Sequence, residues 1–420
     1  MIPLAKPLLD EKEAQAAYKT ILSGWVTQGP KVQEFEEAFA AYVGAKHACA
    51  VSNCTTALQL SFLVLGVQPG DFVVTVSHSF IGTANSVRSC GAEPVFVDID
   101  PQTYNMCPKT LDALLKDECV KKGEGLYYKN VDKLAVGESP LVFIDKQKRG
   151  RIAAIMPVHQ VGMPCDLKAI LQIAKKYHLP VVEDAACAIG CEIQWEGQWE
   201  KIGKPHGDIA CFSFHPRKIM TTGDGGMITT NNAQFDQKLR LLRNHGMNIS
   251  GAERLKAKKF VLERYLMTAF NYRMTDIQAA VGIAQLEKVP EFIKQRRKIG
   301  GYYRKYFAEI DWLELPFEPD YARANWQSYL IRLLKNAPLG QTELMHYLFE
   351  NGVATIPGVM NAHQESPYLA AQYSLKHSEE ARKEAVIFPF YVGLAEQDIK
   401  KMSEILKRLE TRQGITSSKH

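Results

Sequence analysis

The sequence lacks long apolar runs and concentrated charge. No apolar stretch reaches the roughly 20 residues that a membrane-spanning helix needs, and the N-terminus has no apolar core typical of a signal peptide. The net charge of +5 is small for 420 residues, and no basic run with interleaved aromatic residues is present. We therefore expect a soluble protein that contacts neither a membrane nor nucleic acid.

The cysteines lack a pairing pattern. Nine are spread along the chain, an odd number, and most lie in apolar or small-residue runs that are typical of reduced thiols in a core. Cys187 and Cys191 are four residues apart, but no second pair at metal-ligand spacing accompanies them. We expect no metal site and a reducing, cytoplasmic location.

Short apolar runs alternate with helical patterns through the middle of the chain. Strands are expected at 48–51, 71–76, 94–97, 152–156, 181–182 and 209–212, and helices at 55–65, 81–90 and 167–176. This alternation predicts an α/β fold in which helices flank both faces of a mostly parallel sheet.

The same patterns suggest how the chain is divided. We expect an N-terminal arm with helices at 1–45, a large domain at 46–290, a small α+β domain at 291–410 and a disordered tail at 411–420. A stretch at about 115–150 is rich in Lys, Asp, Glu and Gly, and it predicts a surface insertion with a small hairpin.

Lys218 is the most informative single residue. It follows Ser213-Phe214-His215-Pro216-Arg217 and precedes a glycine-rich turn, between two apolar segments. A lysine removed from water has a lowered pKa and becomes an amine nucleophile. Such an amine forms a Schiff base with a carbonyl, including the aldehyde of pyridoxal phosphate (PLP). Taken alone, a solvated surface lysine is the commoner case, since the chain has 51 Lys and Arg.

Other parts of a PLP site lie near the ends of predicted strands. Asp184 could hold a pyridine nitrogen protonated, and the hydroxyl-rich start of a helix around Thr55 suits a phosphate. Phe80 could stack on a flat cofactor, and His159 could contact cofactor or substrate. The alternatives are helix capping by Asp184 and by the stretch 52–58, a core position for Phe80 and a structural role for His159. Together these residues point to one site at the edge of one sheet.

The chain resembles the DegT/DnrJ/EryC1/StrS aminotransferases, the sugar-aminotransferase branch of the fold-type I PLP-dependent enzymes. The resemblance covers about residues 1–410 and rests on the stretches 23–30, 52–58, 157–162, 183–186, 213–226 and 271–276. The segment Ser213-Phe214-His215-Pro216-Arg217-Lys218, with Thr222-Gly223-Asp224-Gly225-Gly226 after it, is the most specific of them.

The resemblance implies a role for each matching residue. Lys218 would hold PLP and move a proton in turnover, Asp184 would pair with the pyridinium nitrogen and Phe80 would stack on the ring. The phosphate would be bound by Thr55, Cys54 and Ser213, with Asn271 or Arg273 supplied by the partner subunit. A homodimer with shared active sites follows. Cys187 stands where the family often has Gln or His, and a thiol is a weaker donor.

The resemblance also implies the reaction. An amino acid, expected to be L-glutamate, would convert PLP to pyridoxamine phosphate, which would then aminate a keto-sugar, expected to be nucleotide-linked, in amino-sugar biosynthesis. His159, His215 and His363 are candidate substrate contacts. Cyclitol amination, sugar dehydration and a non-catalytic PLP-binding regulator remain alternatives, although dehydratases of this family carry histidine where this chain has Lys218.

Overall fold

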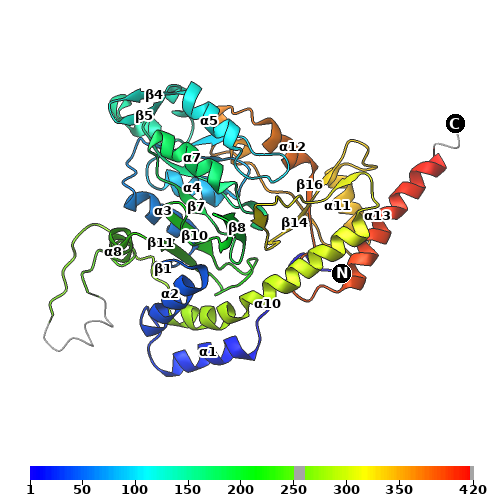
Figure 1. Ribbon diagram of the computed structural model, residues 1–420, viewed down its shortest axis with the longest axis horizontal. Coiled ribbons are helices and arrows are strands. Elements are labelled where there is room, and N and C mark those ends of the chain that lie inside the picture. Colours follow the sequence, from blue (N-terminus) through cyan, green and yellow to red (C-terminus); the bar gives the residue numbers. More distant parts are fainter. Residues whose placement is uncertain (250–260, 417–420) are drawn as a thin grey trace.

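The central feature of the computed structural model, which describes residues 1–249 and 261–416, is a twisted sheet (Figure 1). Its strands are, in spatial order, β3 (Glu93–Val97), β2 (Phe72–Val76), β6 (Ile152–Met156), β7 (Val182–Asp184), β10 (Ile209–Ser213), β11 (Gly226–Thr230) and β1 (His47–Val51). Parallel bridges between β6 and the β7 region join the two halves. Among these described strands β11 alone runs in the direction opposite to all the others, so the prediction of a mostly parallel sheet is confirmed.

Both faces of this sheet are covered. Alternate residues of β2 and β6 enter different apolar clusters: Val74 and Ile155 belong to one, and Val73 and Ala154 to the other. One face packs against α2 (Pro30–Val43), α5 (Pro108–Asp117), α7 (Leu167–Tyr177) and α10 (Asp276–Phe307). The other packs against α3 (Cys54–Val64), α8 (Ala233–Leu242) and the end of α4 (Ile81–Arg88). Strands buried on both faces explain the continuous apolar runs in the sequence.

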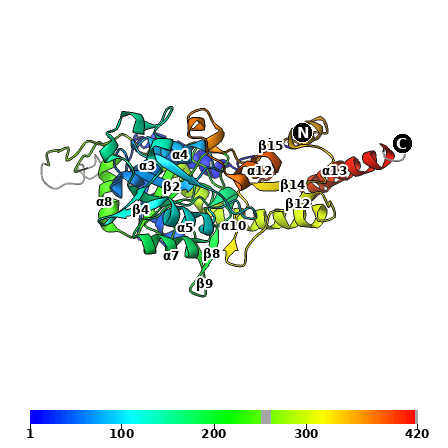
Figure 2. The ribbon, with the colours of Figure 1, turned by 90° about the horizontal axis from the view of Figure 1, so that it is seen from above.

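A second core forms in the C-terminal part of the chain, beside the second half of α10 (Figure 2). It surrounds an antiparallel sheet ordered β12 (Leu313–Glu314), β14 (Tyr329–Leu333), β16 (Ala385–Phe388) and β15 (Ile356–Pro357). The helices here are α11 (Gln341–Glu350), α12 (Lys376–Glu384) and α13 (Glu396–Thr416). A further small sheet joins β13 (Ala322–Arg323) to the projecting hairpin of β8 (Glu192–Trp195) and β9 (Gln198–Lys201).

The insertion contains the expected hairpin, formed by β4 (Cys119–Lys122) and β5 (Gly125–Tyr128), and the short helix α6 (Val131–Leu134). It is fastened to the body through Ser139, whose hydroxyl donates to Glu93 Oε2 at 2.8 Å. Glu93 also accepts from Arg88, which in turn donates to the carbonyl of Pro367 at 2.7 Å. The insertion therefore braces α4 against the C-terminal segment.

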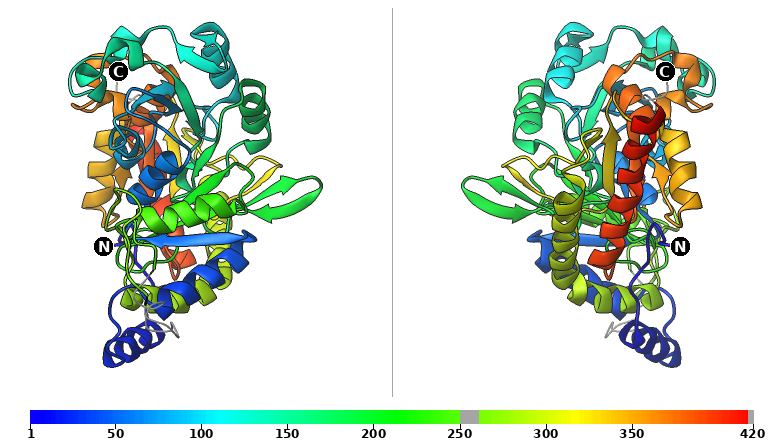
Figure 3. Two further views of the ribbon diagram at one scale, coloured as in Figure 1. Left: turned by 90° about the vertical axis from the view of Figure 1, so that its left-hand side faces the viewer. Right: turned by 90° about the vertical axis from the view of Figure 1, so that its right-hand side faces the viewer.

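The two ends of the chain differ in how well the sequence predicts them. α1 (Glu11–Leu22) begins at an Asp10 cap with Glu13 completing a capping box, as its acidic start indicates, and it packs on α10 (Figure 3). The expected tail is wrong for 411–416, which continue α13, because no proline interrupts the helical stretch. Residues 417–420 lie outside the described part. The domain boundaries stay predictions.

No helix in the described parts of the chain, 1–249 and 261–416, is long and apolar enough to span a membrane.

Candidate active site

Lys218 lies in the loop that joins β10 to β11. Backbone bonds close this loop: Phe214 N donates to Gly225 O at 2.9 Å, and Thr222 N donates to Phe214 O at 3.1 Å. The hydroxyl of Thr221 donates to the same carbonyl at 2.8 Å. The lysine side chain is half-buried, and its Nζ donates to Cys187 Sγ at 3.1 Å. The surface-lysine alternative is therefore wrong.

The pKa of Lys218 differs from the value expected from sequence. Burial by itself lowers the pKa of an ammonium, but the neighbouring thiols of Cys187 and Cys54 and the carboxylate of Asp184 outweigh it, and the pKa of Lys218 is raised above its ordinary value. The expected lowering is thus wrong for this ligand-free protein. The reason is that acidic groups from three separate segments lie close to the amine, and an argument from the burial of the lysine alone does not include them.

Asp184 is the last residue of β7 and is buried at 4% exposure. Its carboxylate accepts from the Thr83 hydroxyl at 2.8 Å and from the Ala186 N–H at 3.2 Å. Burial raises the pKa of Asp184, and these two donors oppose the rise. Turns and no helix follow this residue, so the helix-cap alternative is wrong. The acid instead lies beside Lys218, close enough to affect its charge.

The start of α3 forms an anion cradle. The side chain of Asn53, which the sequence did not single out, caps the helix by accepting from Thr56 N at 2.9 Å. Cys54 and Thr55 follow, where the first N–H groups of a helix have no partner within it. Cys54 is buried, whereas Thr55 is exposed. The capping alternative for this stretch is therefore confirmed, with Asn53 as the capping residue.

Gly226 holds this cradle against the lysine loop. A β-carbon at Gly226 would lie 2.5 Å from Asn53 C and O and 2.9 Å from Cys54 N. Because the clash is with backbone, we expect Gly226→Ala to displace the start of α3, to cost about 1–3 kcal/mol of stability and to weaken cofactor binding measured by absorbance titration. Gly301→Ala in α10, where a β-carbon meets nothing within 4 Å, is the matched control. Equal cofactor affinity in both variants would contradict this role of Gly226.

Phe80 and Thr55 face the same small space. Phe80 immediately precedes α4 and is 70% exposed, which contradicts the core alternative for this residue. A β-carbon at Gly82 would lie 3.1 Å from the Phe80 ring and 3.2 Å from the Thr55 hydroxyl. The aromatic ring and the cradle therefore lie side by side. Ser213 ends β10, and its register partner is Gly226, which places it near the cradle.

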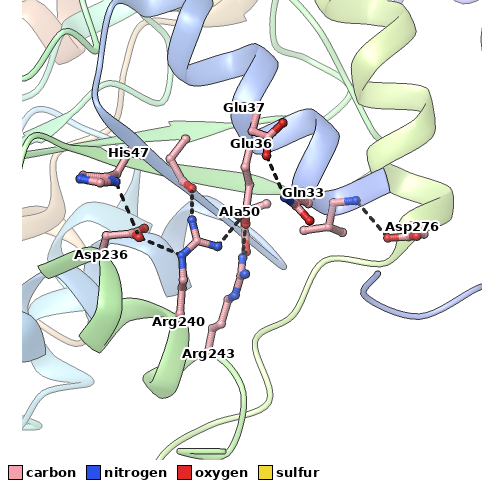
Figure 4. A network of polar contacts seen from close by, with 11 residues as sticks. Gln33, Glu36, Glu37, His47, Ala50, Asp236, Arg240, Arg243 and Asp276 are labelled. Carbon is pink, nitrogen blue, oxygen red and sulfur yellow. Dashed lines mark hydrogen bonds and ion pairs between the residues drawn. The ribbon is translucent and has the colours of Figure 1, made fainter. Parts of the chain in front are cut away.

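A buried ion network fixes the strand that leads into the cradle (Figure 4). Glu36 of α2 accepts from the N–H of Ala50 at 2.8 Å and pairs with Arg243. Arg243 donates to the carbonyl of Ala50 at 2.6 Å, and Arg240 donates to that of Ala48 at 2.9 Å and to Glu36 at 2.7 Å. Burial alone would raise the pKa of Glu36, but the two guanidinium groups outweigh burial and the pKa is lowered. The backbone N–H and C=O groups on the free edge of β1 are therefore hydrogen-bonded by side chains in place of a neighbouring strand.

The three candidate histidines differ in access. His159 is fully buried, with Nδ1 accepting from Cys165 N at 3.0 Å and Nε2 facing Glu183 at 3.1 Å, which favours the structural alternative. His363 is also buried and lies 2.6 Å from the Ser77 hydroxyl through Nδ1. His215 is exposed on the lysine loop. Of the three, only His215 is open to a substrate in this structure.

Asn271 and Arg273 lie on a segment beside the cradle. Ser52 N donates to Tyr272 O at 2.8 Å, and Arg273 donates to Asn244 Oδ1 at 2.8 Å. Asn271 is exposed. Thr275 caps α10. The next residue, Asp276, accepts from the N–H groups at the start of α2, including that of Gly29 at 2.7 Å.

The donor set of this site fits PLP. It offers an amine for an aldehyde, a buried carboxylate for a pyridinium, an exposed ring for stacking and free N–H groups at a helix start for a phosphate. No group of three or more His, Cys, Asp or Glu in the described part could hold a metal ion.

The chain is 35% identical to GDP-perosamine synthase of Caulobacter vibrioides, over 97% of this chain and 98% of that protein. It is 32% identical to the spore coat polysaccharide biosynthesis protein SpsC of Bacillus subtilis, over 97% and 96%. The crystal structure of the aminotransferase TlmJ from Streptoalloteichus hindustanus matches with a TM-score of 0.79 at 27% identity, over 99% of this chain and 100% of that one.

These likenesses agree with the predicted fold-type I architecture. The model of one family matches residues 7–407, nearly the whole chain. The chain belongs to the DegT/DnrJ/EryC1/StrS aminotransferase family.

Proposed function

We propose that this aminotransferase uses PLP to move an amino group from L-glutamate to a nucleotide-linked keto-sugar in amino-sugar biosynthesis. The observation that carries the proposal is the Lys218 amine, held beside the buried Asp184 and next to the cradle at Thr55. The sugar is supported by two relatives, which are named for GDP-perosamine synthesis and for spore coat polysaccharide biosynthesis.

The residues of the site have separate tasks in the proposed reaction. Bound PLP supplies an electron sink for the carbon that loses a proton. Lys218 Nζ holds the cofactor at rest and, once released, takes and returns that proton. Asp184 keeps a positive charge on the ring nitrogen, and Phe80 covers the ring. The N–H groups of Cys54 and Thr55, with Ser213, bind the phosphate.

The proposal includes a homodimer in which Asn271 or Arg273 reaches the cradle of the partner subunit. Two features support it. Asn271 is exposed, although its backbone pairs with that of Asn244. The segment before it carries Leu262, Tyr265 and Leu266, which are 60–65% exposed, and exposed apolar groups of this size mark contact surfaces.

The amino-donor half-reaction tests this function. PLP-loaded protein is expected to lose its long-wavelength absorbance when L-glutamate is added, and to regain it when a keto-sugar nucleotide is then added. Glutamate alone tests the aminotransferase reaction, and a panel of keto-sugar nucleotides tests the acceptor. An unchanged spectrum with glutamate and with other amino acids would favour a regulator that binds PLP without turnover. If the absorbance returned only with keto-cyclitols, the result would favour cyclitol amination.

A further inference from the structure

Cys187 differs from the other cysteines of this chain in what it contacts. All nine are free thiols. Within residues 1–249 and 261–416, Cys187 alone hydrogen-bonds a side-chain amine, since Lys218 Nζ donates to its sulfur at 3.1 Å. Both side chains are half-buried, at the edge of the space where Asp184 and Cys54 also lie. An oxidant small enough to enter this site reaches the sulfur and the amine together.

The remaining thiols are poorer targets for oxidation. Seven of them are buried, and burial raises the pKa of each: Cys49, Cys54, Cys90, Cys119, Cys165, Cys191 and Cys211. The thiolate is the form that oxidants attack, so raised pKa values and burial protect these seven. Cys107 is the one other half-exposed thiol, and it has no amine beside it among the contacts of the described residues.

We propose that Cys187 is an oxidation site whose sulfenic acid is captured by the Lys218 amine, which gives a reversible sulfur–nitrogen link. In the first step a peroxide oxidises the thiol to a sulfenic acid, while its O–O bond breaks and water leaves. In the second step the neutral amine attacks sulfur, the S–O bond breaks and a second water carries away the hydroxyl and an amine proton. Nitrogen nucleophiles are known to trap sulfenic acids in this way.

The link would take Lys218 out of use. Two equivalents of an external thiol reverse it, because they reduce the sulfur, return the amine and leave as a disulfide. The consequence for turnover rests on the proposed function, in which Lys218 holds the cofactor. While Lys218 holds PLP, its nitrogen is not free to trap the sulfenic acid. The link can therefore form only in the cofactor-free protein or after an amino donor has released the lysine.

Mass spectrometry of peroxide-treated protein tests the link. We would treat cofactor-free protein with hydrogen peroxide at about pH 9, where more of the amine is neutral. A loss of about 2 Da is expected from the balance above, on a peptide pair that joins residues 187 and 218, with restoration by dithiothreitol. The PLP-loaded protein is expected to gain about 16 Da on Cys187 instead. Adding L-glutamate to it should restore the 2 Da loss.

Matched variants separate the steps. Cys187→Ser should show neither mass change at this position, and Lys218→Arg should show the 16 Da gain without the link. Cys107 in the wild-type protein reports general thiol oxidation. Absence of a 187–218 link in the cofactor-free protein, or equal oxidation of Cys107 and Cys187, would overturn the proposal. A link that forms without cofactor but not after glutamate would support the site while contradicting the proposed function.

Discussion

Lys218→Ala is expected to lower the rate of amino transfer at least about 10³-fold, since it removes both the nucleophile and the group that moves the proton. The amine of Lys218 lies against the thiol of Cys187 and near the carboxyl group of Asp184. PLP should then bind without being fixed by borohydride at this position. Single-turnover absorbance with L-glutamate measures the rate, and peptide mass after borohydride treatment locates the cofactor.

Lys218→Arg is the control for charge. It keeps a cation beside Asp184 but cannot act as the amine, so it should be as inactive as Lys218→Ala. If the arginine variant retained wild-type rates, the charge and not the nucleophile would explain the role of Lys218.

A mixture of Lys218→Ala and Arg273→Ala subunits tests the shared site, because one of the two sites in a mixed dimer is then intact. If Arg273 completes the phosphate site of the partner subunit, activity is expected to recover when the two variants are mixed.

Asp184→Asn is expected to lower the same rate about 10²- to 10³-fold, because a neutral amide cannot stabilise positive charge on a ring nitrogen. Its effect on folding should be small. The raised pKa of Asp184 means that the folded state holds the proton more tightly than the unfolded state does. That contribution to stability is present at low pH and is lost as pH rises through the folded pKa. At neutral pH the buried charge therefore costs stability in the cofactor-free protein.

The substitution removes that cost and disturbs one of two hydrogen bonds, those from Thr83 and Ala186. We expect the free energy of unfolding without cofactor to stay within about 1 kcal/mol of wild type. Thr83→Val is the control for positioning, since it leaves the carboxylate but removes a donor, and its rate loss should be smaller. A variant Asp184→Asn that transaminates normally, or that fails to fold without cofactor, would contradict this assignment.

The sheet could be predicted from sequence because its signals are local. The strand at 152–156 matches the structure at both ends, and the helix at 167–176 is one residue shorter than α7, since apolar runs and helical spacing need no knowledge of neighbours. The helical structure of 411–416 was harder to predict, because a short polar stretch after a helix carries no apolar periodicity to indicate that α13 continues. Capping was expected in the stretch 52–58, but Asn53 was not named as its residue, although its position before a helix is a recognisable signal.

The chemistry of the site could be predicted only in part. The resemblance in the 213–226 segment singled out Lys218, and the end of a buried strand singled out Asp184. The Thr83 donor to Asp184 is 101 residues away in sequence, and no local pattern links the two. The groups that enclose His159 and His363 are likewise distant in sequence. From sequence alone both histidines therefore looked accessible to a substrate.

The sequence by itself determined the parts: an amine, an acid, an aromatic ring and a helix start, each encoded by its immediate neighbours. The tertiary structure decided which of these parts meet. Parallel strands bring their carboxyl ends to one edge only after the order β3-β2-β6 and β7-β10-β11-β1 is set by packing across the whole chain. That packing placed Cys187 against Lys218 and raised the pKa of the amine that the sequence had predicted to be lowered.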